Sequence, residues 1–309
     1  GAGLVVGNDQ SGTATIYHID VESGLATPIY SNTTADAKPW GMAYDPGTNT
    51  LYWNNGGNLY NSPFSDSLTP SAPVAMTFNG ASTNFVGLAW RDGMLLGTRN
   101  ISTEAVYQID PTTGVATQLF VYSSALDFGG LDVDATTGTL YGLSDTSVIG
   151  LHEIDVVGMS TTLRAPYPSG ESDIDGLAVY NGIAYYVTDG PNTTQANFYI
   201  FDIASGTQTG TIPSPFTGSG TFCAAAFVPD SAGTNGACCA GATCSVTSPS
   251  GCAGSNTSFA GAGTVCNVPG DNVSPCCKAD FNHVNGVTVQ DIFDFLTAYF
   301  TSSPQADIS

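Results

Sequence analysis

The sequence predicts an all-β protein whose main part is a five-bladed β-propeller. Three observations indicate this fold: a strand motif that recurs every 43 to 48 residues, a second motif with the same period, and termini that each supply part of one repeat. A fixed period of that length is typical of repeat architectures, and about four short strands per period is the size of one propeller blade.

The first motif is an apolar strand built around a small residue. Its copies are Trp40–Asp45, Val86–Trp90, Gly129–Asp134, Asp175–Val179 and a weaker one at Cys223–Pro229. With Gly41, Gly87, Gly130, Gly176 and Ala224 taken as equivalent, the spacings are 46, 43, 46 and 48 residues. We therefore expect five blades, each with one of these strands innermost.

The second motif is a half-buried strand followed by a turn that begins with Asp and commonly closes with Gly. Its copies are Ile16–Thr27, Val106–Thr117, Leu151–Asp155, Tyr199–Thr207 and a degraded one at Leu59–Pro63. Asp caps such a turn through its own side chain, and Gly supplies a positive φ. Asp20, Asp110, Asp155 and Asp202 are therefore expected to stabilise the scaffold.

The phase of the repeat at the two termini predicts how the ring closes. Gly3–Gly7 matches the second strand of a repeat, and the missing first strand is the last copy, at 222–229. Pairing a strand from each terminus removes open edges. The expected domains are the propeller at 1–230, a Cys-rich segment at 231–277 and a loop–helix segment at 278–309.

The charge balance excludes some classes of partner. The chain has 5 Lys and Arg against 26 Asp and Glu, a formal charge of −21. No basic patch is available for nucleic acid or an anionic membrane, and no apolar run is long enough to span a bilayer. Because the sequence begins at Gly1 without Met, we expect a mature extracellular protein after removal of a signal peptide.

Eight cysteines predict a disulfide framework. They are Cys223, Cys238, Cys239, Cys244, Cys252, Cys266, Cys276 and Cys277. Seven of them lie in a Gly- and Ser-rich stretch that cannot build a core of its own, so covalent links are expected there. A metal cluster is the alternative, but the stretch has no His and no pair of C-x-x-C units. Eight cysteines allow 105 pairings, and the sequence does not choose among them.

Residues 280–291 match the length of an EF-hand loop and predict a Ca²⁺ site. The expected ligands are Asp280, Asn282, the carbonyl of Gly286, Thr288 and Asp291. The match departs at Val284, which offers no side-chain oxygen, and at Asn285, which stands where the loop needs Gly. The alternative is a capped loop that only starts a helix.

A short amphipathic helix is expected from about residue 289 to 300. Its apolar face consists of Ile292, Phe293, Phe295, Leu296, Tyr299 and Phe300. One short helix cannot bury such a face alone, so it must bind its own domain or another chain.

Two C-terminal motifs resemble a known family. Ala279–Asn282 followed by Val287–Leu296 resembles the dockerin-type repeat of secreted planctomycete proteins, and Gly236–Cys239 with Cys244, Cys252, Gly263–Cys266 and Cys276 resembles the Cys-rich module that often precedes it. The blades are similar to propellers found in such proteins. The resemblance implies a secreted protein with calcium in its tail. Dockerins hold two calcium repeats, and Ala306–Ile308 looks like the opening of the second.

No catalytic motif stands out. Gly-x-Ser-x-Gly, His-Glu-x-x-His and a phosphate-binding Gly loop are all missing from the sequence. Asp127, Asp173, Asp175 and Asn84 precede or open innermost strands and could reach the mouth of the channel, although turn capping is the favoured interpretation.

Two functions fit these observations. The favoured one is a non-enzymatic structural or adhesive protein, in which the tail of one copy binds the next and builds a homopolymer. The alternative is a carbohydrate-binding or carbohydrate-active propeller that is anchored by its tail. Few charges and no convergent catalytic set favour the first, whereas a glycan in the channel would favour the second.

Overall fold

The computed structural model describes residues 3–101, 103–190 and 196–229 of the propeller region. Beyond them it describes 236–240, 243–247, 252, 257–259, 266, 292, 293, 296, 297 and 300. The predicted calcium ligands Asp280–Asp291, and Phe295 and Tyr299 of the expected helix, lie outside the described residues. The chain separates into two compact units, one at 2–229 and one at 230–309 together with residue 1.

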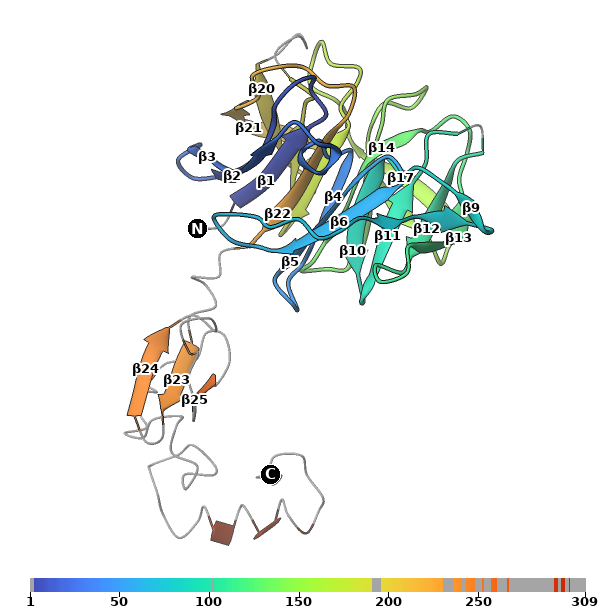
Figure 1. Ribbon diagram of the computed structural model, residues 1–309. Coiled ribbons are helices and arrows are strands. Elements are labelled where there is room, and N and C mark those ends of the chain that lie inside the picture. Colours follow the sequence, from blue (N-terminus) through green and yellow to red (C-terminus); the bar gives the residue numbers. More distant parts are fainter. Residues whose placement is uncertain are drawn as a thin grey trace. The chain divides into compact units, whose positions relative to one another are not determined.

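The first unit is a five-bladed β-propeller (Figure 1), as the repeat predicts. Blade 1 is β4 (Gly41–Asp45), β5 (Thr50–Asn55), β6 (Asn58–Pro63) and β7 (Val74–Ala75). Blade 2 is β10 (Gly87–Arg91), β11 (Met94–Thr98), β12 (Ala105–Ile109) and β13 (Val115–Val121). Blade 3 is β14 (Phe128–Asp134), β15 (Thr139–Ser144), β16 (Gly150–Asp155) and β17 (Ser160–Ala165). Blade 4 is β18 (Gly176–Tyr180), β19 (Ile183–Val187), β20 (Asn197–Asp202) and β21 (Thr207–Pro213).

Blade 5 combines strands from both ends of the unit. Its order is β22 (Cys223–Val228), β1 (Gly3–Asn8), β2 (Ala14–Asp20) and β3 (Ala26–Asn32), and the 3₁₀ turn η1 (Ala35–Ala37) follows. β1 pairs antiparallel with β22 from Gly3 opposite Val228 to Asn8 opposite Cys223. Just beyond this ladder, the Asp9 carboxylate accepts hydrogen bonds from the backbone N–H groups of Thr221 (2.6 Å) and Phe222 (3.0 Å).

Blade 1, which carries the degraded copy of the second motif, has the most irregular outer edge. β7 is only two residues long, and the chain then leaves blade 1 for the outer edge of blade 2. There β8 (Thr77–Phe78) pairs in parallel with β13, and β9 (Ala81–Ser82) pairs with β8.

Apolar clusters fill the spaces between neighbouring blades, and the innermost strands β4, β10, β14, β18 and β22 contact one another in cyclic order. Side chains alternate along each innermost strand, as in any β-strand. In β22, Ala225 and Phe227 pack toward blade 4, whereas Ala226 packs toward blade 1. The two faces of this strand thus pack against the two neighbouring blades.

The central glycines of the first motif are required by the close approach of these strands. A Cβ on Gly41 would lie 2.7 Å from the carbonyl oxygen of Val86, and one on Gly130 would lie 2.5 Å from that of Asp175. Only glycine fits where two backbones come this near.

The Asp-capped turns are confirmed. Asp20 Oδ1 accepts hydrogen bonds from the N–H groups of Glu22 (3.1 Å) and Ser23 (2.8 Å), and Gly24 follows with φ of 70°. Asp110 and Asp202 make the same kind of turn in blades 2 and 4.

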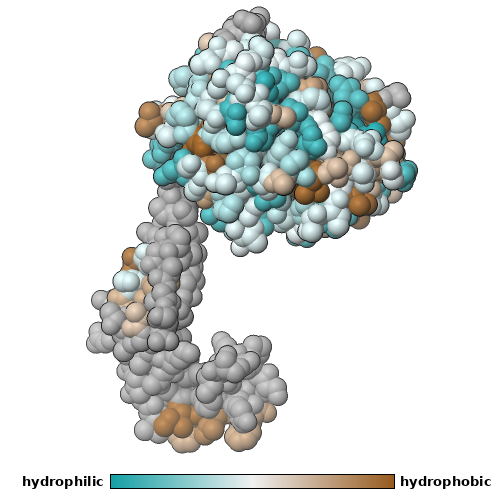
Figure 2. All heavy atoms as spheres, viewed as in Figure 1, coloured by the Kyte–Doolittle hydropathy of each residue, from teal (hydrophilic) through white to brown (hydrophobic). Residues whose placement is uncertain are grey.

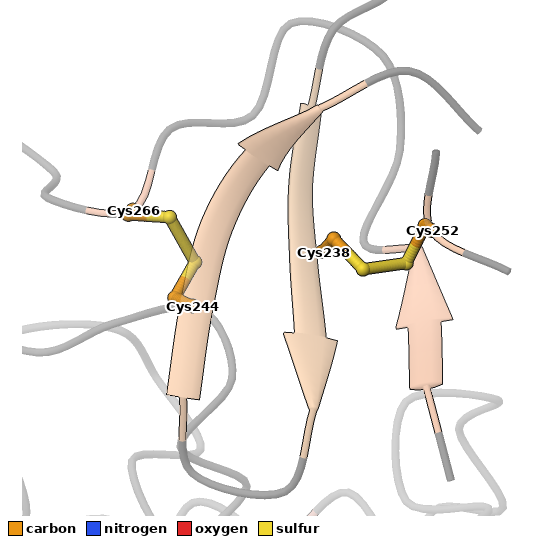
Figure 3. Close-up of a disulfide and its surroundings, with 4 residues drawn as sticks. All are labelled: Cys238, Cys244, Cys252 and Cys266. Atoms are coloured by element: carbon orange, nitrogen blue, oxygen red, sulfur yellow. A yellow bond between two sulfur atoms is a disulfide. The ribbon is translucent and has the colours of Figure 1, made fainter. Parts of the chain in front are cut away.

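In the second unit, β23 (Gly236–Ala240) lies between β24 (Thr243–Thr247) and β25 (Thr257–Phe259). Disulfides join Cys238 to Cys252 and Cys244 to Cys266 (Figure 3). Cys239 is disulfide-bonded as well. Disulfide links in this segment are therefore confirmed.

For Cys223 the disulfide prediction is wrong. Its thiol is free and fully buried in β22, and it donates a hydrogen bond to the Val187 carbonyl (Sγ to O 2.9 Å). It is the one cysteine among residues 2–229, so it packs as a small apolar side chain between two blades.

Across the described residues, no helix combines the length and apolar character needed to cross a bilayer.

Candidate ligand-binding pocket

The channel has two mouths, which differ in chemistry. The innermost strands all begin at one mouth and end at the other. Between the two mouths the middle of the channel is filled by residues such as Met42, Leu88 and Leu131, and no space for a water molecule remains there. A ligand of the channel must therefore bind at one of its mouths.

The mouth where the innermost strands end, the aromatic mouth, holds a cavity of about 220 Å³. All five blades contribute to its lining. Blade 1 supplies Tyr44, blade 2 Trp90, blade 3 Asp132, blade 4 Tyr180 and blade 5 Phe227. We call this cavity the aromatic pocket.

The rings of the aromatic pocket are held by further rings. Trp90 stacks on Tyr52 with a centroid distance of 5.2 Å and an interplanar angle of 7°. Tyr180 stacks on Phe227 at 4.5 Å and 6°. Stacking on one face fixes the plane of Trp90 and of Tyr180, so the walls of the pocket are ordered before any ligand arrives.

Asp132 is the buried charged residue of the pocket, with 7% of its surface exposed. Its Oδ1 accepts a hydrogen bond from Val133 N (2.8 Å), and its Oδ2 accepts one from Val179 N in blade 4 (2.6 Å). Burial raises the pKa of this carboxyl well above its usual value, because the charged form loses hydration.

Asp134, two residues further along β14, anchors the rim. Its carboxylate accepts hydrogen bonds from Asn181 N (3.2 Å) and Gly182 N (2.8 Å), which form the tight turn between β18 and β19. It also accepts one from Thr136 N (2.9 Å) in its own turn. Blade 3 therefore fixes the position of the blade 4 turn that carries Tyr180.

Arg91 and Asp92 complete the rim on blade 2. Asp92 adopts a φ of 51° and Gly93 a φ of 81°, so a two-residue turn joins β10 to β11. This turn places one cationic and one anionic side chain beside the cavity.

The opposite mouth, the carboxylate mouth, gathers eight acidic residues from several blades. They are Asp9, Glu104, Asp127, Asp145, Glu171, Asp173, Asp175 and Asp189. Burial and mutual repulsion raise the pKa of Glu104 to about 7 and that of Asp189 to about 6. Burial, with repulsion from Asp173 and Asp145, raises the pKa of Asp175 well above its usual value.

The structure brings Asp127, Asp173 and Asp175 together at this mouth, the interpretation that the sequence ranks below turn capping. Within the described residues their carboxylates accept no hydrogen bond from a turn, so turn capping does not account for them. Asn84 lies nearby and lines a separate cavity of about 330 Å³ with Trp40 and Arg99.

The carboxylate mouth holds no ready-made metal site in the described part of the chain, since no group of three His, Cys, Asp or Glu side chains there is arranged to bind an ion. Arg99 is occupied at the edge of this mouth: it lies 5.4 Å from the Tyr107 ring and 5.6 Å from the Phe78 ring.

Five of the C-terminal residues are described, at 292, 293, 296, 297 and 300, and all are in helical conformation. Thr297 Oγ1 donates to the Phe293 carbonyl (2.7 Å) one turn earlier. The apolar residues among them, Ile292, Phe293, Leu296 and Phe300, are 58%, 58%, 38% and 78% exposed. Figure 2 shows this apolar surface in brown.

Comparison with known proteins finds distant structural similarities. The chain is similar to a chain in a nidogen–laminin complex, with a TM-score of 0.47 and 13% identity over 73% of this chain and 98% of that one. It is also similar to Kuenenia stuttgartiensis hydrazine synthase (TM-score 0.38, 15% identity, 57% of this chain and 49% of that one). The third is Myxococcus xanthus glutaminyl cyclase (TM-score 0.35, 18% identity, 47% of this chain and 64% of that one). The chain thus spans less than two thirds of the last two. No protein-family model and no curated protein matches it.

Sequence reasoning missed the aromatic pocket, although a signal was present. At the position of Asp132 the other four innermost strands carry Ala43, Ala89, Ala178 and Ala226, each 1% exposed or less. A single residue that breaks the pattern of a repeat marks the blade where something other than packing is required.

Proposed function

We propose that this protein is a non-enzymatic, extracellular propeller that binds a carbohydrate ring in the aromatic pocket. The observation that carries the proposal is the convergence of Trp90, Tyr180 and Asp132 on one cavity. Sugar rings offer apolar C–H faces that pack on aromatic side chains and hydroxyls that hydrogen-bond to polar ones, and a few polar groups in an apolar pocket suit such a ligand. The disulfides of the second unit are compatible with an extracellular location.

The same pocket favours binding over hydrolysis. Glycosidases of the common kind place two carboxyl groups on either side of the scissile bond, one as acid and one as base or nucleophile. Here Asp132 has both oxygens engaged by backbone N–H groups, and Asp92 is exposed on the rim. Neither is poised for proton transfer, so we propose no catalytic role for them.

A panel of soluble oligosaccharides tests the proposed function. Isothermal titration calorimetry with the whole chain should find at least one oligosaccharide that binds, and Trp90→Ala should weaken that binding by about tenfold or more, the loss of ~1.4 kcal/mol or more. Trp40→Ala, which removes a tryptophan from the other mouth, is the control and should leave binding unchanged. Equal weakening by the two changes would contradict the proposal.

A second candidate function is assembly, and the exposed C-terminal side chains favour it. Ile292, Phe293, Leu296 and Phe300 offer an apolar face of the kind that helices use to bind grooves. We propose that this face binds the propeller of another copy and builds a homopolymer, with a dockerin-like Ca²⁺ loop at Asp280–Asp291 ordering the segment. Differing donor and acceptor surfaces give head-to-tail growth.

The double substitution Phe293→Asp with Leu296→Asp tests assembly. It should leave a folded monomer, whereas the wild type should sediment as larger species with calcium and shrink with a chelator. Assembly of the double mutant like the wild type would refute the role of this face. Assembly that ignores the chelator would refute the role of calcium alone.

We further propose that the β1–β22 ladder is what closes the ring. The ladder joins a strand from each end of the propeller, and the Asp9 carboxylate accepts two backbone hydrogen bonds just before β22.

A further inference from the structure

Asp132 breaks the five-fold pattern, and it lines the aromatic pocket. Four blades carry a buried alanine at this position, and blade 3 carries a carboxylate. The middle of an innermost strand packs against its neighbour blade, so packing alone would favour alanine in blade 3 also. The carboxylate ties blade 3 to blade 4 through Val179 N, and it also lines the aromatic pocket, where a ligand can reach it.

The carboxylate is also poorly compensated in charge. Its neighbours include Asp134, whose negative charge raises its pKa further, and within the described residues no Lys or Arg forms an ion pair with it. Two backbone N–H groups supply the hydrogen bonds that hold it in place. A buried carboxylate without an opposite charge is unfavourable, and binding a cation relieves that cost.

The walls of the pocket favour a cation as well. The faces of Trp and Tyr rings carry negative potential and attract ammonium groups, and Trp90 and Tyr180 both line the cavity. The whole chain carries a formal charge of −21, so its field draws cations toward it. The size is restrictive: about 220 Å³ lies below the roughly 300–1,000 Å³ of pockets for drug-sized ligands, so one small ring fits.

We infer that the carbohydrate bound in the aromatic pocket is an amino sugar, whose protonated amine binds the Asp132 carboxylate while its ring packs on Trp90 and Tyr180. This inference rests on the proposed carbohydrate-binding function. Arg91 at the rim donates to ring or hydroxyl oxygens. An acidic sugar paired with Arg91 is the opposite assignment, and the test includes it.

The test compares three oligosaccharides of equal length by calorimetry at physiological ionic strength. The first is a glucosamine tetrasaccharide, which carries protonated amines. The second is an N-acetylglucosamine tetrasaccharide, in which the amines are acylated and neutral, and the third is a galacturonate tetrasaccharide, which is anionic. We expect the amine form to bind at least about tenfold more tightly than the neutral form, as charged hydrogen bonds commonly contribute that much.

Asp132→Ala is the decisive variant, since the other four blades show that alanine fits this position. It should abolish the preference for the amine, so that the amine and neutral forms bind with affinities within about twofold of each other. Asp132→Asn, which keeps the shape and an acceptor for Val179 N, should do the same. Asp127→Asn at the carboxylate mouth is the control for general attraction of cations and should keep the preference.

The outcomes separate the inference from the proposed function. Equal binding of amine and neutral forms, tighter binding of the acidic form, or a preference that survives Asp132→Ala would overturn the inference while carbohydrate binding stands. Absence of binding by all three, together with the wider oligosaccharide panel, would overturn both.

Discussion

The two mouths of the channel lie at opposite ends of the same five innermost strands, and the side chains that line them differ in chemistry. The aromatic mouth has ordered rings around one buried carboxylate, whereas the carboxylate mouth gathers eight acidic residues. The strands are similar in all blades, with small residues and alanines at their centres. The difference lies in residues that vary from blade to blade, such as Trp90 and Asp132 within β10 and β14 at one mouth and Asp173 before β18 at the other. The repeat therefore determines the fold, and positions that vary between blades form separate sites.

At the carboxylate mouth, the variable residues are carboxylates whose charged forms are destabilised. Carboxylates from several blades repel one another there, and the pKa values of Glu104, Asp175 and Asp189 rise as a result of burial and that repulsion. At the aromatic mouth, Asp132 is stabilised by two backbone N–H groups, and the structure there is specific to one blade. Burial nevertheless raises the pKa of Asp132 as well, because two N–H groups do not replace the hydration that its charged form loses.

Deleting residues 1–10 should have the largest effect on stability, because it removes a strand of blade 5, and all blades are needed to form both mouths. The deletion takes away β1, whose Leu4, Val5 and Val6 are fully buried. Each contributes about 1.5–3 kcal/mol, and the sum approaches the 5–15 kcal/mol stability of a typical domain. We expect aggregation instead of a cooperative melt by calorimetry. A monomer with unchanged melting temperature would show that the β1–β22 ladder does not close the ring.

Asp134→Ala should destabilise the propeller by about 3 kcal/mol, because it removes the charged acceptor of two part-buried N–H groups in the blade 4 turn. Urea denaturation measures the loss. The matched control is Asp20→Ala, which removes a cap whose hydrogen bonds stay within its own turn, and its loss should be smaller. Equal losses would mean that Asp134 is only a turn cap and does not position the aromatic mouth.

The carboxylate mouth should make stability depend on pH. The pKa of Glu104 in the folded protein, about 7, lies above its ordinary value of 4.5, so between those values the folded state holds more protons than the unfolded state. Stability therefore falls as pH rises through this window. Glu104→Gln, which keeps a hydrogen-bond acceptor for Tyr122, should flatten this slope of melting temperature against pH. The slope of the wild type is the comparison, and an unchanged slope in Glu104→Gln would exclude this group as a source.

Cys223→Ala should have the smallest effect, about 1 kcal/mol, since it removes one buried sulfur from between two blades. The thiol of the native protein should resist alkylation and react only after unfolding. Labelling in the native state, detected by peptide mass spectrometry, would contradict the free, fully buried thiol.

The scaffold could be predicted from the sequence because its signals are local and repeated. The spacing of Gly41, Gly87 and Gly130 and the caps of Asp20 and Asp110 each recur, and each needs only neighbouring residues to be understood. The repeat left no ambiguity about blade number.

The site could not be predicted in the same way. Asp132 is visible only when blades are aligned and the odd residue is noticed, and the gathering of Glu104 with Asp127 and Asp145 depends on strands far apart in sequence. An even cysteine count predicts a disulfide for Cys223, whereas its burial inside the propeller core keeps the thiol free. Periodicity in the sequence therefore predicts the fold. The protonation, bonding and ligand contacts of individual polar residues depend on their burial, which the sequence pattern does not give.

The three tryptophans allow the most direct test of the central claim, because they report from different places. Trp90 lines the aromatic pocket, Trp40 lies at the carboxylate mouth and Trp53 is fully buried. Two variants each keep one reporter: Trp40→Phe with Trp53→Phe leaves Trp90, and Trp53→Phe with Trp90→Phe leaves Trp40. Titration with an oligosaccharide that binds should change the fluorescence of the Trp90 variant in a saturable way and leave the Trp40 variant unchanged. A saturable change in the Trp40 variant alone would place the ligand at the carboxylate mouth and contradict the account.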